Sequence, residues 1–364
     1  MTNPAIASPV VGDAERERVR EVLDSGQLAD GEEVREFEDE FAAFCGAEGG
    51  VATSNGTTAL HAAFEALGVG SGDAVVTTPF SFVASANAIR HAGAEPVFAD
   101  VDPATYNLDP VSVERVLEAR DDVAAILAVH LYGLPADVDA LAALADEHGA
   151  ALVEDAAQAH GAEYQGERVG SLGDAACFSF YPTKNMTTGE GGMVTTDRAD
   201  VEEGLRRFVN HGRDSAGYEH VSVGHNFRMT NMAAAIGRAQ LERLPEFVAE
   251  RRKNAAALNR VLDDAPVVPP VEPAERRHSY HQYTIACADR DAVVSHLERA
   301  GIGYGIYYPT PIHEQPAYAG VDADAPRASA AADSVLSLPV HPGLDAGDVE
   351  RIGAAIRGEV TVDA

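Results

Sequence analysis

The chain has 364 residues, 46% of them hydrophobic, so it is long enough for about two domains with a sizeable core. Aspartate and glutamate number 58 against 27 lysines and arginines, which gives a formal net charge of −31. Nucleic acids and anionic membranes are bound through basic patches, so this charge balance argues against both as partners.

The first predicted elements are two helices, over residues 13–24 and 32–44, where apolar side chains recur at helical spacing. Short apolar runs that are typical of buried strands then alternate with amphipathic helical segments. The expected strands are 74–77, 96–99, 124–129 and 151–153, and the expected helices are about 57–68, 82–92, 110–119 and 136–148. This alternation predicts an α/β fold with a mostly parallel sheet between helices, and ligands bound beyond the carboxyl ends of its strands.

The pattern changes after about residue 170, where the strands become shorter. The later expected strands are 176–180, 192–196 and 280–286, and the later expected helices are 198–210, 231–263 and 291–300. The long helix, which we expect to be interrupted at Pro245, bridges to a second domain. We therefore predict a large cofactor-binding domain over residues 1–245, N-terminal helices included, and a smaller α+β domain over residues 246–364.

Lys184 is one of only two lysines in the chain, and arginine supplies the remaining positive charge. It follows a short apolar run and precedes a glycine-rich turn at residues 189–192, whose spacing does not fit a dinucleotide-binding fingerprint. A guanidinium stays protonated at neutral pH, whereas a lysine amine with a lowered pKa forms a Schiff base with a carbonyl group. We therefore predict that Lys184 anchors a carbonyl cofactor.

A second motif runs from Thr53 to Leu60 and contains Asn55-Gly56-Thr57-Thr58. Asn-Gly often forms a hairpin turn, but the residues that follow are helical, so Gly56 is predicted to start a helix. Bare amides and hydroxyl groups at a helix start bind phosphate well. A simple N-cap without a ligand is the alternative.

Asp155 lies just beyond the predicted strand 151–153, after Glu154. It is either an ordinary loop or cap residue or a carboxylate at the mouth of the sheet. If the cofactor is pyridoxal phosphate, Asp155 would pair with the ring nitrogen and keep it protonated, which makes the ring an electron sink. Phe80 or Phe82 could stack on that ring, although each residue taken alone is more often part of the core.

Together these motifs resemble the DegT/DnrJ/EryC1/StrS family of pyridoxal-phosphate enzymes, the sugar aminotransferases. The resemblance covers nearly the whole chain, from Ser25 to Tyr318. The matching pieces include residues 25–28, 54–60, 100–103, 129–133, 154–161, 178–180 with Lys184, 224–229 and 313–318.

The resemblance implies the fold-type I aminotransferase architecture, pyridoxal 5'-phosphate as cofactor and a homodimer with active sites at the subunit interface. It implies that Lys184 forms the Schiff base and moves protons, and that Asp155 pairs with the ring nitrogen. The implied cofactor-binding residues are Gly56, Thr57 and Ser179 for the phosphate, Phe82 and Gln158 for the ring, Asp155, Lys184, and Asn226 from the neighbouring subunit. The residues implied on the substrate side are His160, Tyr308 and His313.

The implied activity is transfer of an amino group from glutamate or a similar donor to a keto group of a nucleotide-linked sugar, for surface polysaccharide or glycan biosynthesis. The alternatives are a sugar dehydratase of the same family, in which a histidine replaces the lysine, and a non-catalytic regulatory member. Lys184 argues against the dehydratase, and the acidic charge argues against a DNA-binding regulator. Ala286 and Tyr307 depart from residues frequent in the family, arginine and histidine, so the sugar is not identified.

Three widely spaced cysteines, 45, 177 and 287, fit a reducing compartment and no disulfide framework. His211, His220 and His225 lack metal-ligand spacing, so no metal is expected. The sequence shows no signal peptide and no apolar run of ~20 residues, so we expect a cytoplasmic protein. The acid-rich, lysine-poor composition is typical of a salt-loaded cytoplasm, with an ordinary acidic cytosolic protein as the alternative.

Overall fold

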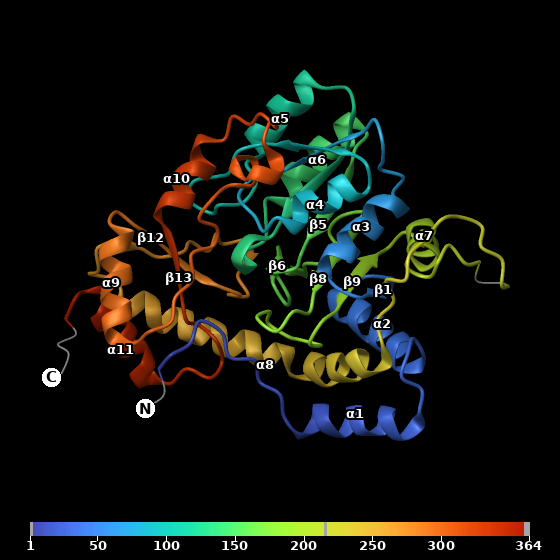
Figure 1. Cartoon of the computed structure of the whole chain (residues 1–364). Helices are drawn as coiled ribbons and strands as arrows, with labels where there is room; N and C mark the ends of the chain where they lie inside the picture. Colours follow the sequence, from blue (N-terminus) through green and yellow to red (C-terminus); the bar gives the residue numbers. More distant parts are fainter. Residues whose placement is uncertain (1–2, 215–216, 360–364) are drawn as a thin grey trace.

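A seven-stranded sheet forms the centre of the larger part of the molecule in the computed structural model, which describes residues 3–214 and 217–359 (Figure 1). In spatial order its strands are β1 (Gly49–Thr53), β9 (Gly192–Thr196), β8 (Ala175–Ser179), β5 (Ala151–Asp155), β4 (Val123–Val129), β2 (Ala74–Thr77) and β3 (Glu95–Phe98). Neighbours from β8 to β3 pair in parallel, and only β9 runs against the others. The predicted mostly parallel sheet is therefore confirmed.

Side chains alternate between the two faces of the sheet, and both faces are covered. On β4, Ala125 and Leu127 point into one apolar cluster, whereas Ile126 and Ala128 point into another. The helices packed on the first face are α3 (Gly56–Ala66), α4 (Ala84–His91) and α7 (Ala199–Val209). The helices packed on the second face are α2 (Glu32–Cys45), α5 (Pro110–Ala119), α6 (Val138–His148) and the first half of α8 (Asn231–Val261). Strands buried on both faces explain the continuous apolar runs of the sequence.

Helix α8 runs from the large sheet to the C-terminal part of the chain (Figure 1) and packs into a hydrophobic cluster in each of them. Its first half packs Leu241 and Leu244 against the sheet and α2, while its second half packs Leu258 into the C-terminal core. α1 (Asp13–Ser25) lies along it. The expected interruption at Pro245 is wrong, since the helix continues through this exposed residue. Packing on both sides of the proline holds the helix together despite the missing amide donor. The domain boundary predicted between residues 245 and 246 falls inside this helix and stays a prediction.

The C-terminal core is built on a small antiparallel sheet in the order β10-β12-β13. Its elements are β10 (Val267–Val268), β12 (Tyr283–Cys287), α9 (Arg290–Ala300), α10 (Pro326–Ser334), β13 (Val335–Leu338) and α11 (Ala346–Ile356). The strand expected from residue 280 starts only at Tyr283, because Tyr280 has a φ of 47°, which extended backbone does not adopt.

Short elements complete the described chain. They are the strands β6 (Glu163–Tyr164), β7 (Glu167–Arg168) and β11 (Arg276–Arg277), and the 3₁₀ turns η1 (Leu131–Gly133), η2 (Ile312–Glu314) and η3 (Pro316–Tyr318). The N-terminal segment reaches across to the C-terminal part, where the carbonyl of Pro4 accepts from the amide of Gly303 at 2.8 Å. The carbonyl of Ala5 lies 3.1 Å from His341 Nε2. Across residues 3–214 and 217–359, no helix combines the length and the apolar character needed to span a bilayer.

Candidate active site

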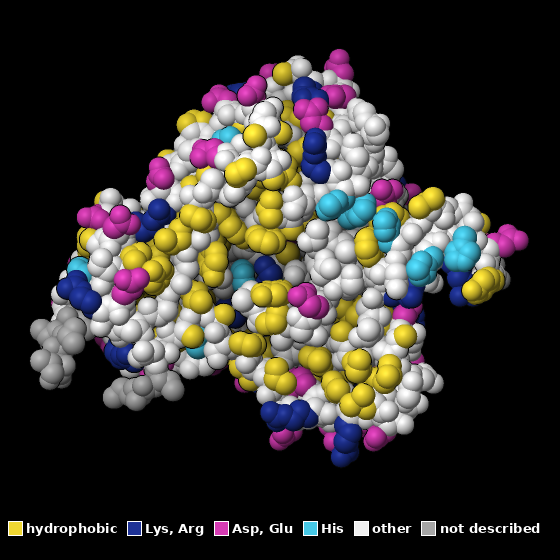
Figure 2. Space-filling model, in the orientation of Figure 1, with side chains coloured by type: hydrophobic (Ala, Val, Ile, Leu, Met, Phe, Trp, Pro, Cys, Tyr) yellow, Lys and Arg dark blue, Asp and Glu magenta, His cyan; other side chains and the backbone are white. Residues whose placement is uncertain are grey.

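A cavity of about 1000 Å³ lies at the carboxyl ends of the parallel strands. Asp155 ends β5 and Ser179 ends β8, and both residues line it. Gln282 and Tyr308, from the C-terminal part of the chain, line it as well. The space-filling view shows the molecule hollowed near the middle of this face (Figure 2). The cavity thus lies where parallel sheets of this kind bind their ligands.

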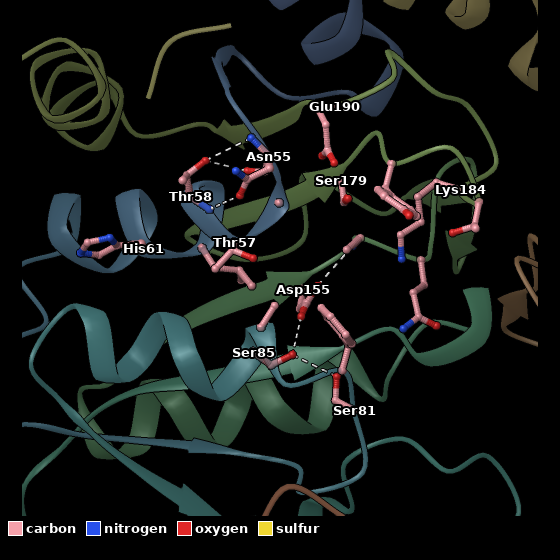
Figure 3. A pocket seen from close by; sticks show the side chains of 18 of the residues that line it. Asn55, Thr57, Thr58, His61, Ser81, Ser85, Asp155, Ser179, Lys184 and Glu190 are labelled. Carbon is pink, nitrogen blue, oxygen red and sulfur yellow. Dashed lines mark hydrogen bonds between the residues drawn. The ribbon is translucent and has the colours of Figure 1, made fainter. Parts of the chain in front are cut away.

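The side chain of Lys184 points into this cavity from the turn that follows β8 (Figure 3). The turn is fixed by its backbone, since the amide of Lys184 donates to the carbonyl of Tyr181 at 2.9 Å. Burial lowers the pKa of the Lys184 amine to about 8, while the negative charge of Asp155 acts in the opposite direction. A large fraction of the amine is therefore neutral near pH 8, and the neutral amine is the nucleophile.

Asp155 faces the same cavity from the end of β5 and is only 6% exposed. Its Oδ2 accepts a hydrogen bond from Ser85 Oγ at 2.7 Å, and its Oδ1 accepts from the amide of Ala157 at 3.3 Å. Burial raises the pKa of the Asp155 carboxyl, whereas these two hydrogen bonds and the charge of Lys184 lower it. A buried carboxylate with cavity access can pair with a positively charged ring nitrogen.

The start of α3 offers unused donors to the cavity. Asn55 caps the helix by accepting from the amide of Thr58 at 3.0 Å, and Thr58 Oγ1 accepts from the amide of Asn55 at 3.1 Å. Within the described chain, no hydrogen bond is made by the amides of Gly56 and Thr57. A Cβ on Gly56 would lie only 2.7 Å from Ser179 Cβ, so glycine lets the helix start approach the end of β8. The free amides of Gly56 and Thr57, together with the hydroxyls of Thr57 and Ser179, form a cradle suited to a phosphate.

Gln158 and the tyrosines around it form a hydrogen-bonded wall of the cavity. Gln158 Oε1 accepts from the amide of Tyr132 at 2.8 Å, and its Nε2 donates to the hydroxyl of Tyr308 at 3.1 Å. Burial raises the pKa of Tyr308, so its hydroxyl stays protonated. Phe82 is 55% exposed and lines the cavity, with its ring centroid 6.2 Å from that of Tyr308. An apolar ring open to the cavity can stack on a planar ligand.

His160 does not line the cavity. Its ring is fully buried and packs against Phe41, Phe178 and Phe180 on the second face of the sheet. Burial, together with the charge of Lys184, lowers the pKa of His160 to about 3, so it is neutral. Its predicted place on the substrate side is not supported by this arrangement and stays a prediction.

His313 and Asn226 also do not line the cavity of one chain. His313 packs its ring beside Phe98, with Nε2 at 3.6 Å from a carboxylate oxygen of Glu314. Asn226 pairs with Asn210 in a short bridge, although the residues on either side of it do line the cavity. A contact of Asn226 with a neighbouring subunit, and a substrate contact of His313, stay predictions.

Several residues that line the cavity are not predicted from the sequence pattern. Ser81 and Ser85 lie behind Asp155, and His281 and Gln282 come just before β12. The two serines are four residues apart beside Phe82, a spacing that puts them on one side of a helical turn and could have drawn attention. His281 and Gln282 carry no such signal, because only the packing of the C-terminal part brings them to the sheet.

A group of histidines lines the cavity near α3. The ring of His61 lies 5.7 Å from those of His91 and His225, and His225 stacks on Phe227 at 4.5 Å. Burial and then the neighbouring His225 and His91 lower the pKa of His61 to about 4. Across residues 3–214 and 217–359, no three histidine, cysteine or acidic side chains are placed to hold a metal ion.

The cavity residues fit pyridoxal phosphate part by part. The amine of Lys184 suits its aldehyde, the buried carboxylate of Asp155 suits its ring nitrogen, and the open start of α3 with Ser179 suits its phosphate. These groups come from three separate elements of the fold and face one space.

Comparison with known proteins gives a family match over most of the chain. The sequence profile of the DegT/DnrJ/EryC1/StrS aminotransferase family matches residues 9–357. The chain is 43% identical to the pleiotropic regulatory protein of Geobacillus stearothermophilus, over 89% of this chain and 88% of that one. It is 40% identical to the UDP-2-acetamido-2-deoxy-3-oxo-D-glucuronate aminotransferase of Pseudomonas aeruginosa, over 93% of this chain and 94% of that one.

Solved structures share the whole architecture. DesV of S. venezuelae, in complex with a ketimine intermediate, superposes with a TM-score of 0.91 at 39% identity, over 96% of this chain and 95% of that one. The pyridoxal-phosphate form of the sugar aminotransferase Spr1654 of Streptococcus pneumoniae superposes with a TM-score of 0.92 at 26% identity, over 98% of both chains. The predicted fold class is confirmed by these likenesses.

Proposed function

Because the chain belongs to the DegT/DnrJ/EryC1/StrS aminotransferase family, we propose that it transfers an amino group to the keto group of a nucleotide-linked sugar. Pyridoxal phosphate is the cofactor, and glutamate or a similar amino acid is the donor. The product is an amino sugar for surface polysaccharide or glycan synthesis. The proposal depends on one observation above all: the Lys184 amine, the buried Asp155 carboxylate and the open helix start at Gly56 share one cavity.

Each of these residues has a distinct task. When bound, pyridoxal phosphate supplies an electron sink for the carbon next to the transferred nitrogen. Lys184 Nζ would hold the carbonyl carbon of the cofactor, and as a free neutral amine it could take up and return a proton. The hydrogen bonds to Asp155 favour its ionised form, which attracts the ring nitrogen. Gly56, Thr57 and Ser179 would hold the phosphate, Phe82 would stack on the ring, and Gln158 with Tyr308 would orient polar groups beside it.

The test combines a spectroscopic and a chemical readout. Purified protein is mixed with pyridoxal phosphate, and we expect visible absorbance that borohydride abolishes and that Lys184→Ala never acquires. Incubation with glutamate and a panel of nucleotide-linked keto-sugars is then followed by mass, where amination of one sugar is expected. A protein that takes up no cofactor would overturn the proposal. Cofactor uptake without amination of any sugar would support cofactor binding and reject the sugar substrate.

A regulatory role is the second candidate, favoured by the name of the Geobacillus relative. The chain offers little for nucleic acid, because its net charge is −31. The sugar panel separates the two candidates, since a purely regulatory protein would bind a ligand without turning it over.

We include in the same proposal a cytoplasmic homodimer whose subunits share their active sites, in a salt-rich cell interior. The dimer is supported by exposed apolar side chains in the segment near Asn226, where Tyr218 is 79% and Val223 is 90% exposed. The salt-rich interior is supported by the excess of acidic residues. Light scattering of the purified protein tests the dimer, for which twice the chain mass is expected.

A further inference from the structure

Two buried serines form a hydrogen-bonded chain behind Asp155 (Figure 3). Ser85 Oγ lies 2.7 Å from Asp155 Oδ2, and Ser81 Oγ lies 3.0 Å from Ser85 Oγ. Ser85 is 1% and Ser81 is 3% exposed, so bulk water does not compete for either bond. Ser81 lies just before α4 and Ser85 is the second residue of that helix, whereas Asp155 ends β5.

The direction of both bonds follows from the donors available. An ionised carboxylate only accepts, so the single hydroxyl proton of Ser85 is donated to Asp155. In the hydrogen bond between the two serines, the Ser81 hydroxyl must then donate to Ser85 Oγ. The chain therefore runs from Ser81 to Ser85 to Asp155, and each donor strengthens the next one.

We propose that Ser85, oriented by Ser81, is a positioning residue that keeps Asp155 ionised and aligned for the ring nitrogen of the bound cofactor. The inference rests on the proposed use of pyridoxal phosphate.

Other groups near Asp155 do not replace this contact. The amide of Ala157 donates at 3.3 Å, a longer distance than the 2.7 Å bond from Ser85. Lys184 and His130 act on the carboxylate only through their charge. Burial by itself favours the neutral carboxyl, so loss of the closest donor shifts the balance toward a form that attracts a protonated ring nitrogen poorly.

The experiment compares two ligands that differ at one atom of the ring. Cofactor-free protein is titrated with pyridoxal phosphate and with its 1-carba analogue, in which carbon replaces the ring nitrogen, and dissociation constants are read from absorbance. Because a hydrogen bond to a charged group is among the stronger ones, Ser85→Ala is expected to weaken pyridoxal phosphate binding about tenfold relative to the analogue. Ser81→Ala removes the hydrogen bond between the two neutral serine hydroxyls. It is expected to change the ratio of the two dissociation constants roughly threefold.

Three variants separate positioning from general stability. Ser85→Thr keeps the hydroxyl and is expected to restore the ratio of the two dissociation constants. Ser337→Ala removes another buried serine hydroxyl, 2.8 Å from Thr284 Oγ1 in the small C-terminal sheet, and is expected to leave the ratio unchanged. Should Ser85→Ala not fold, the change of the ratio in Ser81→Ala decides.

If the serine variants lost the same affinity for both ligands, or lost affinity for neither, the inference would be overturned. The serines would then act on the fold alone or not at all. A wild-type protein that binds neither ligand would be a different result, since it removes the proposed function itself and the inference with it. Wild-type binding of pyridoxal phosphate with an unchanged ratio in Ser85→Ala leaves the proposed function intact and rejects only the role of Ser85.

Discussion

The amine of Lys184 has a pKa near 8, whereas an exposed lysine titrates at about 10.4. Its neutral fraction therefore grows as the pH rises through about 8, and only the neutral form attacks a carbonyl. Capture of pyridoxal phosphate by cofactor-free protein should accelerate with pH and level off above that midpoint. Stopped-flow absorbance measures this rate.

Two variants sharpen this prediction for Lys184. Asp155→Asn removes the charge that raises the pKa of the amine, so the midpoint is expected at lower pH. Lys253→Arg changes the other lysine, which lies exposed beside Glu250, and is expected to leave the profile as it was. A wild-type midpoint near that of a free lysine would contradict the burial of Lys184.

The sequence predicts a site residue well where a side chain with distinctive chemistry lies at or just after the end of a predicted strand. Lys184 stands out because lysine is rare in the chain, and Asp155 because it lies at the end of a buried strand; the structure places both in one cavity. Gln158 and His160 belong to the same motif, but only Gln158 lines the cavity. The ring of His160 packs against Phe41 of the distant helix α2, on the second face of the sheet. Such side-chain directions depend on packing between remote segments, which motif spacing does not encode.

The start of α3 shows how an element constrains its residues. A methyl group on Gly56 would lie 2.7 Å from Ser179 Cβ, so the helix start or the end of β8 would have to move. Gly56→Ala is therefore expected to weaken binding of pyridoxal phosphate by about tenfold or more, which fluorescence titration measures.

The control for Gly56→Ala is Gly70→Ala, where the nearest atom to the added methyl is a carbonyl oxygen at an ordinary 3.6 Å. This variant is expected to bind the cofactor like wild type. Equal affinities for Gly56→Ala and wild type would show that the contact with Ser179 is not needed for the phosphate cradle.

Elements with strong periodicity were predicted well, and those defined by long-range pairing were not. The helix at 110–119 and the strand at 192–196 have the predicted bounds. β1 (Gly49–Thr53) was missed, because its Gly-Gly start carries little strand propensity and pairing with β9 makes it a strand. α8 continues through Pro245 since packing on both cores outweighs the local cost of a proline.

The molecule as a whole carries 31 more negative than positive charges. Screening shortens the Debye length from ~10 Å at 0.1 M salt to ~3 Å at 1 M, which weakens repulsion among the excess acidic groups. We expect Tm to rise by about 5 °C or more as KCl increases, most steeply below about 0.3 M, where screening changes fastest. Differential scanning calorimetry measures it. A Tm that falls or stays level would show that the ion pairs lost to screening outweigh the repulsion relieved.

The contact between the N-terminal segment and the C-terminal core has a consequence for synthesis on the ribosome. Pro4 and Ala5 are translated about 300 residues before their partners Gly303 and His341. All strands of the large sheet precede Gly303 in the sequence, so they can pair before the contacts of Pro4 and Ala5 exist. The contacts of Pro4 and Ala5 can form only after the segment that carries Gly303 and His341 has been made, so this part of the fold is completed late in synthesis.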